Sequence, residues 1–360
     1  MRMHAVIGVA ALAVAGFLAA GPGDARAEGR RIQVVTTLTD YAAVARAVGG
    51  DRVDVKAICE GDQDAHFVKP KPSFAIWVSR ADLFVTTGLD LEMWAPSVLD
   101  KAANPRVMEG QEGYVSVSAG VRLLEIPEIK DRGQGGVHIY GNPHIHTNPL
   151  NMKIVARNLA TGLSKVDAAH AADYRERARA FAAEIDRRMF GPDLLPLLGS
   201  DTLERLAESG NLVSFLSSRT VQGRPMLDLL GGWMKQALAF RGRSLVTYHK
   251  NWIYFARVFG VEVLGEVEPK PGIPPSPKHV EDLIRLMKER RVPVILAANY
   301  FDEDKVRHIA AAVGATPVIV PMSVAGVPGV DDYFALVDYW IRHLADGFAA
   351  ADRAAKEVSQ

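Results

Sequence analysis

Residues 141–149 read GNPHIHTNP, and the interpretation of the whole chain starts from this stretch. It places two histidines, His144 and His146, between two prolines, directly before a long Ala-rich run with helical spacing. Proline fixes the backbone angle φ and disfavours a helical conformation at the residue before it, so Pro143 and Pro149 predict a stiff loop. Loops on a rigid scaffold often carry binding residues. We therefore expect the imidazole of His144 to belong to a binding site.

Two further histidines occupy similar positions. His66 lies in the sequence DAHFVKP and His249 in the sequence TYHKNW, and both follow predicted strands. Neutral imidazole is a preferred ligand of zinc and also suits copper, nickel and iron. Three protein ligands leave a fourth coordination position for water or another group. The central prediction is that His66, His144 and His249 bind one divalent metal ion together.

The first part of the chain alternates between strand and helix patterns. Short apolar runs predict strands at residues 32–37, 53–58, 81–86 and 106–108. The intervening segments have helical apolar spacing, at residues 40–48, 73–78 and 91–103. This βαβ alternation predicts a parallel sheet covered by helices.

The last part of the chain repeats this alternation. Strands are predicted at residues 244–248, 261–264, 294–298 and 317–320, and helices at residues 251–259, 276–291, 302–313 and 331–350. Ser276 followed by Pro277 predicts a helix start, because Ser is a good N-cap and Pro fits the first helical position.

Between the two halves, residues 150–189 are helical throughout and predict one long connecting helix. The predicted organisation is therefore α/β: two βα-repeat lobes with parallel sheets, joined by a long rigid linking helix, with a metal site in the cleft between the lobes. We assign residues 1–27 to a signal peptide, 28–148 to an N-terminal lobe, 149–189 to the linking helix, 190–240 to a helical and loop insertion of unknown role, and 241–360 to a C-terminal lobe. Ligands of such sheets bind beyond the carboxyl ends of the strands, where His66 and His249 are expected.

The N-terminus has the features of an export signal. Arg2 precedes an apolar run at residues 5–20, and Ala25-Arg26-Ala27 forms an A-x-A cleavage site. The alternative is an uncleaved membrane anchor, but the run is shorter than the roughly 20 residues of a spanning helix. No Cys lies near the cleavage site, so lipid attachment is not expected there. The mature protein is predicted to be periplasmic.

Composition excludes several classes of partner and site. The chain has 42 Lys+Arg and 42 Asp+Glu, so no basic excess indicates nucleic acid or an anionic membrane surface. A single cysteine, Cys59, cannot form an internal disulfide in an exported protein. A metal site must then use histidine and carboxylate and not a thiolate cluster. Cys59 lies seven residues before His66 and is a candidate ligand, but the favoured interpretation is a small buried apolar side chain at a strand end.

The remaining histidines divide into two groups. Four are expected to be solvent-exposed or structural: His170, His279, His308 and His343. His138 and His146 lie within six residues of His144, and each remains open as a direct metal ligand or as a residue that holds another imidazole in its tautomer.

Four stretches together resemble a known family. They are DAHFVKPKPS at residues 64–73, NPHIHTNP at 142–149, YHKNWIYFARVFGVEV at 248–263 and the proline-rich loop and helix at 268–297. Most of the mature chain is similar to the periplasmic solute-binding proteins of bacterial zinc and manganese ABC importers, of the zinc type in cluster A-I. The resemblance implies two lobes around a rigid helix, with His66, His144 and His249 as metal ligands. It also implies delivery of the metal to an inner-membrane ABC permease by a monomer, and a periplasmic metallochaperone is a further candidate partner.

Two departures from the family pattern concern the fourth ligand. The family usually has an aromatic residue and an Asp-Pro after the second histidine, where this chain has HTNP with His146 and Asn148. Many members supply a late Asp ligand after the last strand, but residues 320–326 read VPMSVAG and contain no carboxylate. Water and His146 remain candidates for the fourth position. Nitrogen ligands without a carboxylate favour zinc over manganese or iron.

The predicted function is high-affinity binding of zinc in the periplasm and its delivery to a permease, without enzyme activity. The first alternative is an exported metallohydrolase with a zinc ion on three histidines, since such a site can activate water. No Glu adjoins any of the three histidines, and Asp64 is the nearest carboxylate to His66. The second alternative is a binding protein for an organic ligand, in which the histidines only donate hydrogen bonds.

Overall fold

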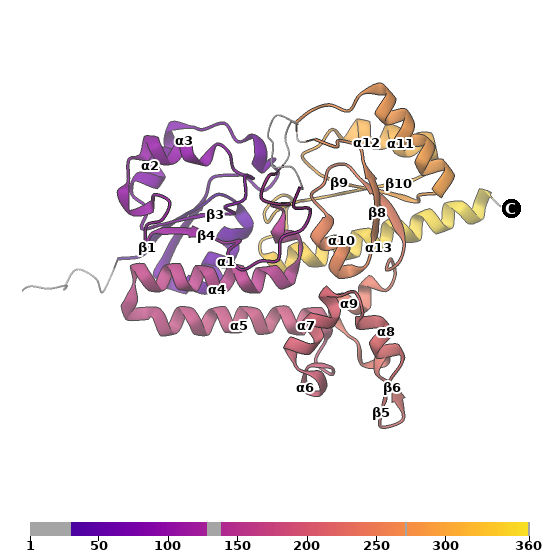
Figure 1. Ribbon diagram of the computed structural model, residues 1–360, viewed down its shortest axis with the longest axis horizontal. Coiled ribbons are helices and arrows are strands. Elements are labelled where there is room, and N and C mark those ends of the chain that lie inside the picture. The colour runs from indigo at the N-terminus through magenta and orange to yellow at the C-terminus, as the bar shows by residue number, and fades with distance from the viewer. Residues whose placement is uncertain (1–29, 128–137, 271, 359–360) are drawn as a thin grey trace, which may run out of the picture.

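The structure is a computed structural model that describes residues 30–127, 138–270 and 272–358. The signal peptide expected at residues 1–27 lies outside the described residues. Two α/β lobes lie side by side, and a pair of helices passes beneath the N-terminal lobe (Figure 1). Across the described ranges, no helix has the length and apolar character that a bilayer-crossing segment requires.

The N-terminal lobe is built on a four-stranded parallel sheet with the order β2-β1-β3-β4. Its strands are β1 (Ile32–Thr36), β2 (Val53–Ala57), β3 (Leu83–Thr86) and β4 (Tyr114–Ser116). Its helices are α1 (Thr39–Gly49), α2 (Pro72–Ser79) and α3 (Ala95–Ala102), with a 3-10 turn η1 (Gly50–Arg52). Successive residues of β1, Val34 and Val35, enter different hydrophobic clusters. Because side chains alternate along a strand, both faces of this sheet are buried, as is usual for parallel sheets.

The C-terminal lobe repeats this arrangement with the sheet order β10-β9-β7-β8, again parallel. Its strands are β7 (Ser244–Thr247), β8 (Glu262–Glu266), β9 (Val294–Ala298) and β10 (Thr316–Val320). Its helices are α10 (Ile253–Phe259), α11 (Pro277–Arg290), α12 (Glu303–Val313) and α13 (Tyr333–Val358). The predicted start of α11 is confirmed, since the Ser276 hydroxyl accepts the backbone N–H of His279 at 3.2 Å.

The continuous helix expected at residues 149–189 is divided in the structure. Helix α4 (Pro149–Val166) ends at Asp167, a 3-10 turn η6 (Ala168–His170) follows, and α5 (Ala171–Phe190) runs back alongside α4 (Figure 1). The Asp167 carboxylate lies 3.0 Å from Nδ1 of His170 and accepts the Tyr174 hydroxyl at 2.5 Å. These local bonds stabilise the turn, because Asp side chains compete with helical hydrogen bonding. Helix α4 therefore belongs to the N-terminal lobe, and α5 alone leads to the C-terminal side.

The prediction of a strand at residues 106–108 is wrong. Residues Pro105–Val107 form a 3-10 turn η3, and the edge strand of the sheet is β4 instead. Pro105 has no backbone N–H to donate, and the Asn104 side chain accepts the N–H of Arg106 at 3.2 Å. Both features favour a turn over a strand.

Residues between α5 and the C-terminal lobe form a small helical unit below that lobe (Figure 1). It contains α6 (Leu195–Leu198), α7 (Ser200–Glu208), α8 (Leu212–Ser217), the two-stranded antiparallel pair β5 (Thr220–Val221) and β6 (Arg224–Pro225), the turn η7 (Met226–Leu229) and α9 (Gly232–Ala237). The buried Trp233 donates its indole N–H to Asp338 of α13 at 2.6 Å. This bond fixes the unit to the C-terminal lobe.

Candidate metal site

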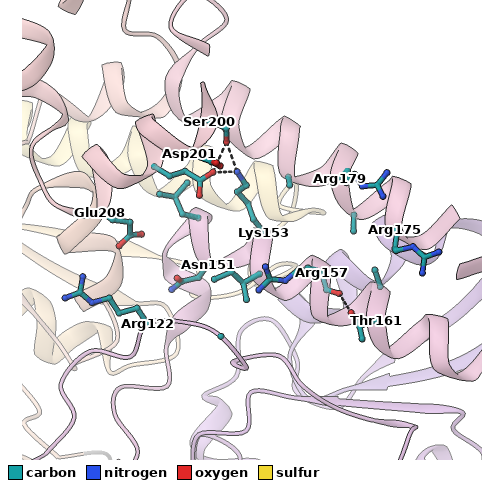
Figure 2. A pocket seen from close by; sticks show the side chains of 17 residues that line it. Arg122, Asn151, Lys153, Arg157, Thr161, Arg175, Arg179, Ser200, Asp201 and Glu208 are labelled. Carbon is teal, nitrogen blue, oxygen red and sulfur yellow. Dashed lines mark hydrogen bonds and ion pairs between the residues drawn. The ribbon is translucent and has the colours of Figure 1, made fainter. Parts of the chain in front are cut away.

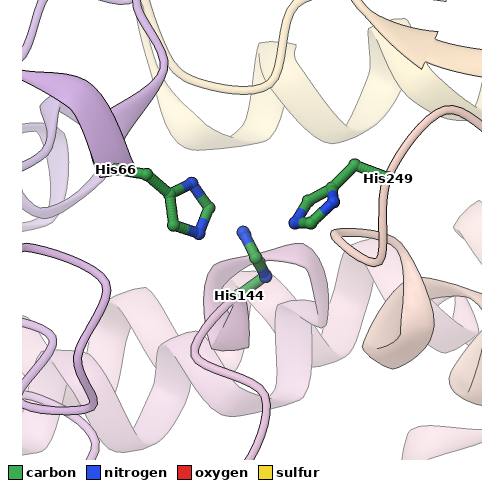
Figure 3. A group of neighbouring side chains, drawn as sticks. All are labelled: His66, His144 and His249. Atoms are coloured by element: carbon green, nitrogen blue, oxygen red, sulfur yellow. The ribbon is translucent and has the colours of Figure 1, made fainter. Parts of the chain in front are cut away.

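The structure brings His66, His144 and His249 together between the lobes (Figure 3). One ring nitrogen from each residue lies within 4.8 Å of the other two. The ring centroids are 5.1 Å apart for His66 and His144, 5.6 Å for His66 and His249, and 5.8 Å for His144 and His249. Their role as metal ligands stays a prediction, but the convergence on which it depends is present.

Each of the three imidazoles comes from a different part of the fold. His66 lies in the 3-10 turn η2 (Ala65–Phe67), which follows β2 in the N-terminal lobe. His249 follows β7 in the C-terminal lobe. His144 immediately precedes the 3-10 turn η5 (Ile145–Thr147). The site therefore exists only when both lobes are assembled around residues 141–149.

Hydrogen bonds attach residues 141–149 to the C-terminal lobe. The hydroxyl of Tyr254 donates to the carbonyl of Asn142 at 2.7 Å, and the Asn142 side chain donates to the carbonyl of Lys250 at 2.6 Å. The hydroxyl of Tyr333 donates to the carbonyl of His146 at 2.6 Å. Because these groups are buried or partly buried, the bonds satisfy polar atoms that water does not reach freely. The stretch is fixed at both of its histidines.

Two of the three imidazoles share one local arrangement. Nδ1 of His66 lies 2.7 Å from Oδ1 of Asp64, and this oxygen also accepts the backbone N–H of His66 at 3.0 Å. Nδ1 of His144 lies 2.9 Å from Oδ1 of Asn142, which accepts the backbone N–H of His144 at 3.0 Å. In both cases an Asp or Asn precedes the histidine by two residues. Oxygen can only accept here, so the proton is on Nδ1 and Nε2 keeps its lone pair.

The third imidazole is oriented by the backbone. Nδ1 of His249 lies 3.2 Å from the carbonyl oxygen of Glu268, which again places the proton on Nδ1. The Glu268 carboxylate lies 3.8 Å from the same Nδ1. Nε2 of His249 and Nε2 of His144 are buried without a hydrogen-bond partner. An unpartnered buried acceptor costs free energy, and a bound cation would remove that cost.

Burial keeps His144 and His249 neutral. Removal from water disfavours the charged ring and, together with the neighbouring imidazoles, lowers the pKa of His144 well below its usual value and that of His249 to about 4. Burial also opposes the charge on Asp64, but the bonds from the ring and backbone of His66 outweigh it and lower the pKa of Asp64. The site therefore combines these two neutral imidazoles with one supporting carboxylate at neutral pH.

His146 lies behind the cluster. Its ring is 6.2 Å from the ring of His144, and both of its ring nitrogens are buried without a partner. It lines a cavity of about 10 Å³ with His66, His144 and Ser323, among others. A cavity of that size holds about one water molecule. Ser323 belongs to residues 320–326, so this wall presents a hydroxyl and not a carboxylate.

His138 is in direct contact with the cluster. Its Nε2 lies 3.2 Å from Nε2 of His66, and its ring is 6.0 Å from the ring of His144. Burial, together with the neighbouring His66 and His249, lowers the pKa of His138 to about 3. Sequence reasoning did not identify Asn142, although the shared spacing of Asp64-x-His66 and Asn142-x-His144 is a signal that could have found it.

Cys59 is excluded from the cluster as expected. Its side chain is buried and its thiol lies 3.4 Å from the carbonyl oxygens of Glu60 and Gln63. Burial raises the pKa of the Cys59 thiol, so the group stays protonated. His279 is structural, since its Nε2 lies 2.8 Å from the carbonyl of Glu266.

A larger hollow lies elsewhere, between α4, α5 and α7 (Figure 2). It has a volume of about 690 Å³ and includes Lys153 among its lining residues. The Lys153 ammonium donates to Asp186 at 2.6 Å, to Ser200 at 3.1 Å and to Glu204. This charged network stabilises the packing of α4 against α5 and α7. The three clustered histidines do not line the hollow, so it is separate from the candidate site.

Known proteins share sequence similarity with most of this chain. The sequence matches the family described as zinc-uptake complex component A, periplasmic, over residues 34–188 and 219–347. The iron-binding protein YfeA of Yersinia pestis is 25% identical over 326 residues, which cover 89% of this chain and 87% of that protein. The manganese ABC transporter substrate-binding lipoprotein PsaA of Streptococcus mitis is 21% identical over 336 residues, which cover 92% of this chain and 93% of that protein.

The fold is also shared with solved structures. A zinc-bound deletion mutant of ZnuA superposes with a TM-score of 0.64 at 20% identity, covering 88% of this chain and 98% of that chain. A manganese-bound periplasmic metal-binding protein from Candidatus Liberibacter asiaticus superposes with a TM-score of 0.63 at 18% identity. The match covers 89% of this chain and 100% of that chain. At such identities the likeness establishes the two-lobed architecture.

Proposed function

Because the chain belongs to the family of periplasmic zinc-uptake components, we propose that it binds zinc between its lobes and delivers it to an ABC importer permease. The ion is cargo, held by Nε2 of His66, His144 and His249. The proposal includes export by the signal peptide and action in the periplasm as a monomer.

One observation carries this proposal: three Nε2 lone pairs face one another while every Nδ1 proton is bonded to oxygen. Asp64, Asn142 and the Glu268 carbonyl hold these protons. Metal-ligating histidines almost always donate the other ring N–H to a carboxylate, a carbonyl or water, which fixes the tautomer and raises the basicity of the ligand. The cluster already has this arrangement, so little reorganisation opposes binding.

The choice of zinc rests on the donor atoms. The curated relatives are named for iron and manganese, so relationship does not decide between metals. Manganese prefers carboxylate and water oxygens, whereas imidazole suits zinc. The two carboxylates beside the cluster, of Asp64 and Glu268, approach Nδ1 atoms, and Ser323 of residues 320–326 adds a hydroxyl to the neighbouring cavity. A site made of imidazole nitrogens therefore favours zinc.

The hydrolase alternative has no support from the site. A hydrolase of this kind needs a general base near the metal-bound water. Asp64, the carboxylate nearest to His66, already accepts hydrogen bonds from the ring and the backbone N–H of His66. Membership of a transport family also favours binding and release over catalysis.

The test is zinc binding by the mature protein with and without one ligand. We expect the wild type to bind about one zinc ion, and His144→Ala to weaken binding about 100- to 1,000-fold, because the site loses one of few direct ligands. His308→Ala, on the exposed surface of α12, is the matched control and should bind like the wild type. Affinities are measured by competition with a chelator of known strength. Equal affinity of the wild type and His144→Ala would exclude the assignment.

A further inference from the structure

We infer that His138 is the fourth metal ligand, so that the proposed zinc site consists of four imidazoles. This inference rests on the proposed function and names the group that completes the site. His138 lies beside His66, with their rings 5.2 Å apart. Residues 320–326 contain no carboxylate, so that segment supplies no carboxylate for the fourth position.

The distance between two nitrogens is the first argument. Nε2 of His138 lies 3.2 Å from Nε2 of His66. Two ligands of a tetrahedral zinc ion, each about 2.0–2.1 Å from the metal, are separated by about 3.3–3.4 Å. The two nitrogens already have the spacing that a shared ion requires. The ring of His138 is 5.2 Å from that of His66, within the 5.1–5.8 Å range of the three-histidine cluster.

The second argument is the arrangement of protons. In the neutral ring with its proton on Nδ1, where Asp64 accepts it, Nε2 of His66 has only a lone pair. The 3.2 Å contact then requires a proton on Nε2 of His138. When the ion binds, this proton moves by exchange with solvent to Nδ1 of His138, and Nε2 becomes a donor to the metal. The imidazole stays neutral, so the change is one of tautomer.

The position of His138 along the chain supplies the third argument. Its carbonyl accepts the N–H of Gly141 at 3.1 Å, which closes a turn onto residues 141–149. Gly141 has φ of +114°, and a Cβ there would lie 3.0 Å from the carbonyl oxygen of Leu124. Only glycine takes this conformation without strain. The turn therefore attaches His138 to the same rigid stretch that positions His144, and a small rotation of the ring completes the approach to His144, now 6.0 Å between ring centroids.

The rival groups are placed less well. His146 stands 6.2 Å from His144, with the small cavity between them, and its nitrogens contact no cluster nitrogen. The carboxylates of Asp64 and Glu268 approach Nδ1 of His66 at 2.7 Å and Nδ1 of His249 at 3.8 Å. A site closed by four imidazoles also leaves no open position for a reactive water, which fits binding and not hydrolysis.

The experiment compares His138→Ala with His146→Ala in the full mature protein, because both residues lie within six positions of His144. We expect His138→Ala to weaken zinc binding about 10- to 100-fold, since water replaces one of four ligands, and His146→Ala to change it less than about threefold. The absorption of the cobalt(II)-substituted protein should change in His138→Ala only. In the wild type, the imidazole ¹⁵N resonance of His138 Nε2 should shift on addition of one equivalent of zinc.

The outcomes separate this inference from the proposed function. If His138→Ala keeps the zinc affinity and cobalt spectrum of the wild type, and the His138 resonance does not move, His138 is not a ligand while zinc binding stands. If His146→Ala loses affinity instead, the fourth ligand is His146. If the wild type binds no zinc, the proposed function itself is wrong. Thermal unfolding of the metal-free variants distinguishes loss of a ligand from loss of the fold.

Discussion

The loop that carries His66 and the segments that carry His144 and His249 hold their imidazoles differently. His144 and His249 are each 2% exposed and lie between the lobes. His66 is only partly buried, and its neighbour Phe67 is 53% exposed. One side of the candidate site is enclosed by protein, and the other borders solvent.

The hydrogen bonds that hold the histidines are also more numerous on the enclosed side of the site than on the solvent side. Asn142 orients His144 with its side-chain oxygen, donates to the Lys250 carbonyl at 2.6 Å and to Glu125 at 2.8 Å, and accepts the Tyr254 hydroxyl through its own carbonyl. His66 depends on Asp64, and its turn is anchored by one bond from the Trp94 indole to the Ala65 carbonyl at 2.8 Å. A fixed pair of ligands can thus remain in place while the His66 loop and His138 adjust around an entering or leaving ion.

The largest loss of zinc affinity is expected from a change in the supporting groups on the enclosed side of the site. Asn142→Ala removes the partner of His144 Nδ1 and the bonds to Lys250 and Glu125 at once. Loss of such supporting groups typically weakens metal binding 10- to 100-fold, and we expect about 100-fold here because several bonds are lost together. The metal-free protein should also be destabilised by about 2 kcal/mol, since a buried network is broken. Chelator competition and thermal unfolding measure the two effects.

Asn142→Asp is the matched control for this prediction. This variant keeps the side-chain oxygen that orients His144, so most of the zinc affinity should be retained. It loses the N–H donor to the Lys250 carbonyl and places a negative charge near Glu125, so the metal-free protein should be less stable than the wild type. If Asn142→Ala leaves zinc affinity unchanged, the enclosed side is not the fixed part of the site.

Much of this arrangement could be predicted from particular residues. The three histidines were recognisable because each follows a strand pattern or lies between prolines, and parallel strands direct their carboxyl ends toward the same edge. The start of α11 was recognisable because Ser276 and Pro277 act locally. In these cases the determinant lies within a few residues of the feature.

Other features depend on contacts between distant segments, which local patterns do not encode. The break after α4 depends in part on Asp167, whose ion pair with Arg52, 3.3 Å away, joins residues 115 positions apart. The contact of His138 with His66 joins residues 72 positions apart. The helical spacing of the sequence continues through Asp167 without a break. No local pattern around His138 indicates its contact with His66.

A smaller loss of zinc affinity is expected from a change on the solvent side of the site. Asp64→Ala removes the acceptor of His66 Nδ1, so this ring loses its fixed tautomer and orientation. We expect about a tenfold loss of zinc affinity, at the low end for supporting groups, because the half-buried loop can adjust and water can replace the carboxylate. Asp64→Asn keeps an oxygen acceptor and should recover most of the loss. A decrease larger than that of Asn142→Ala would reverse the comparison between the two sides.

The smallest effect concerns the contact of the lobes away from the histidines. Asp40 of α1 is fully buried, accepts the N–H of Val324 at 3.3 Å with Oδ1, and has no partner for Oδ2. Burial raises the pKa of Asp40 from 3.8 to about 6. The neighbouring Tyr41 and Tyr333 stay neutral, because burial raises the pKa of each well above its ordinary value.

The sign of the pH dependence follows from this raised pKa. The folded protein binds the Asp40 proton more tightly than the unfolded chain, so the contribution to stability is complete below pH 3.8 and is lost as the pH rises through about 6. Between pH 5 and pH 7 this amounts to about 1 kcal/mol. Asp40→Asn cannot titrate, so its free energy of unfolding minus that of the wild type should be about 1 kcal/mol larger at pH 7 than at pH 5, with zinc affinity unchanged. Denaturant unfolding of the metal-free proteins at the two pH values measures the difference. A loss of zinc affinity in Asp40→Asn would mean that the contact between Asp40 and Val324 also positions the histidines. The site would then depend on this contact between the lobes as well as on the hydrogen bonds around Asn142.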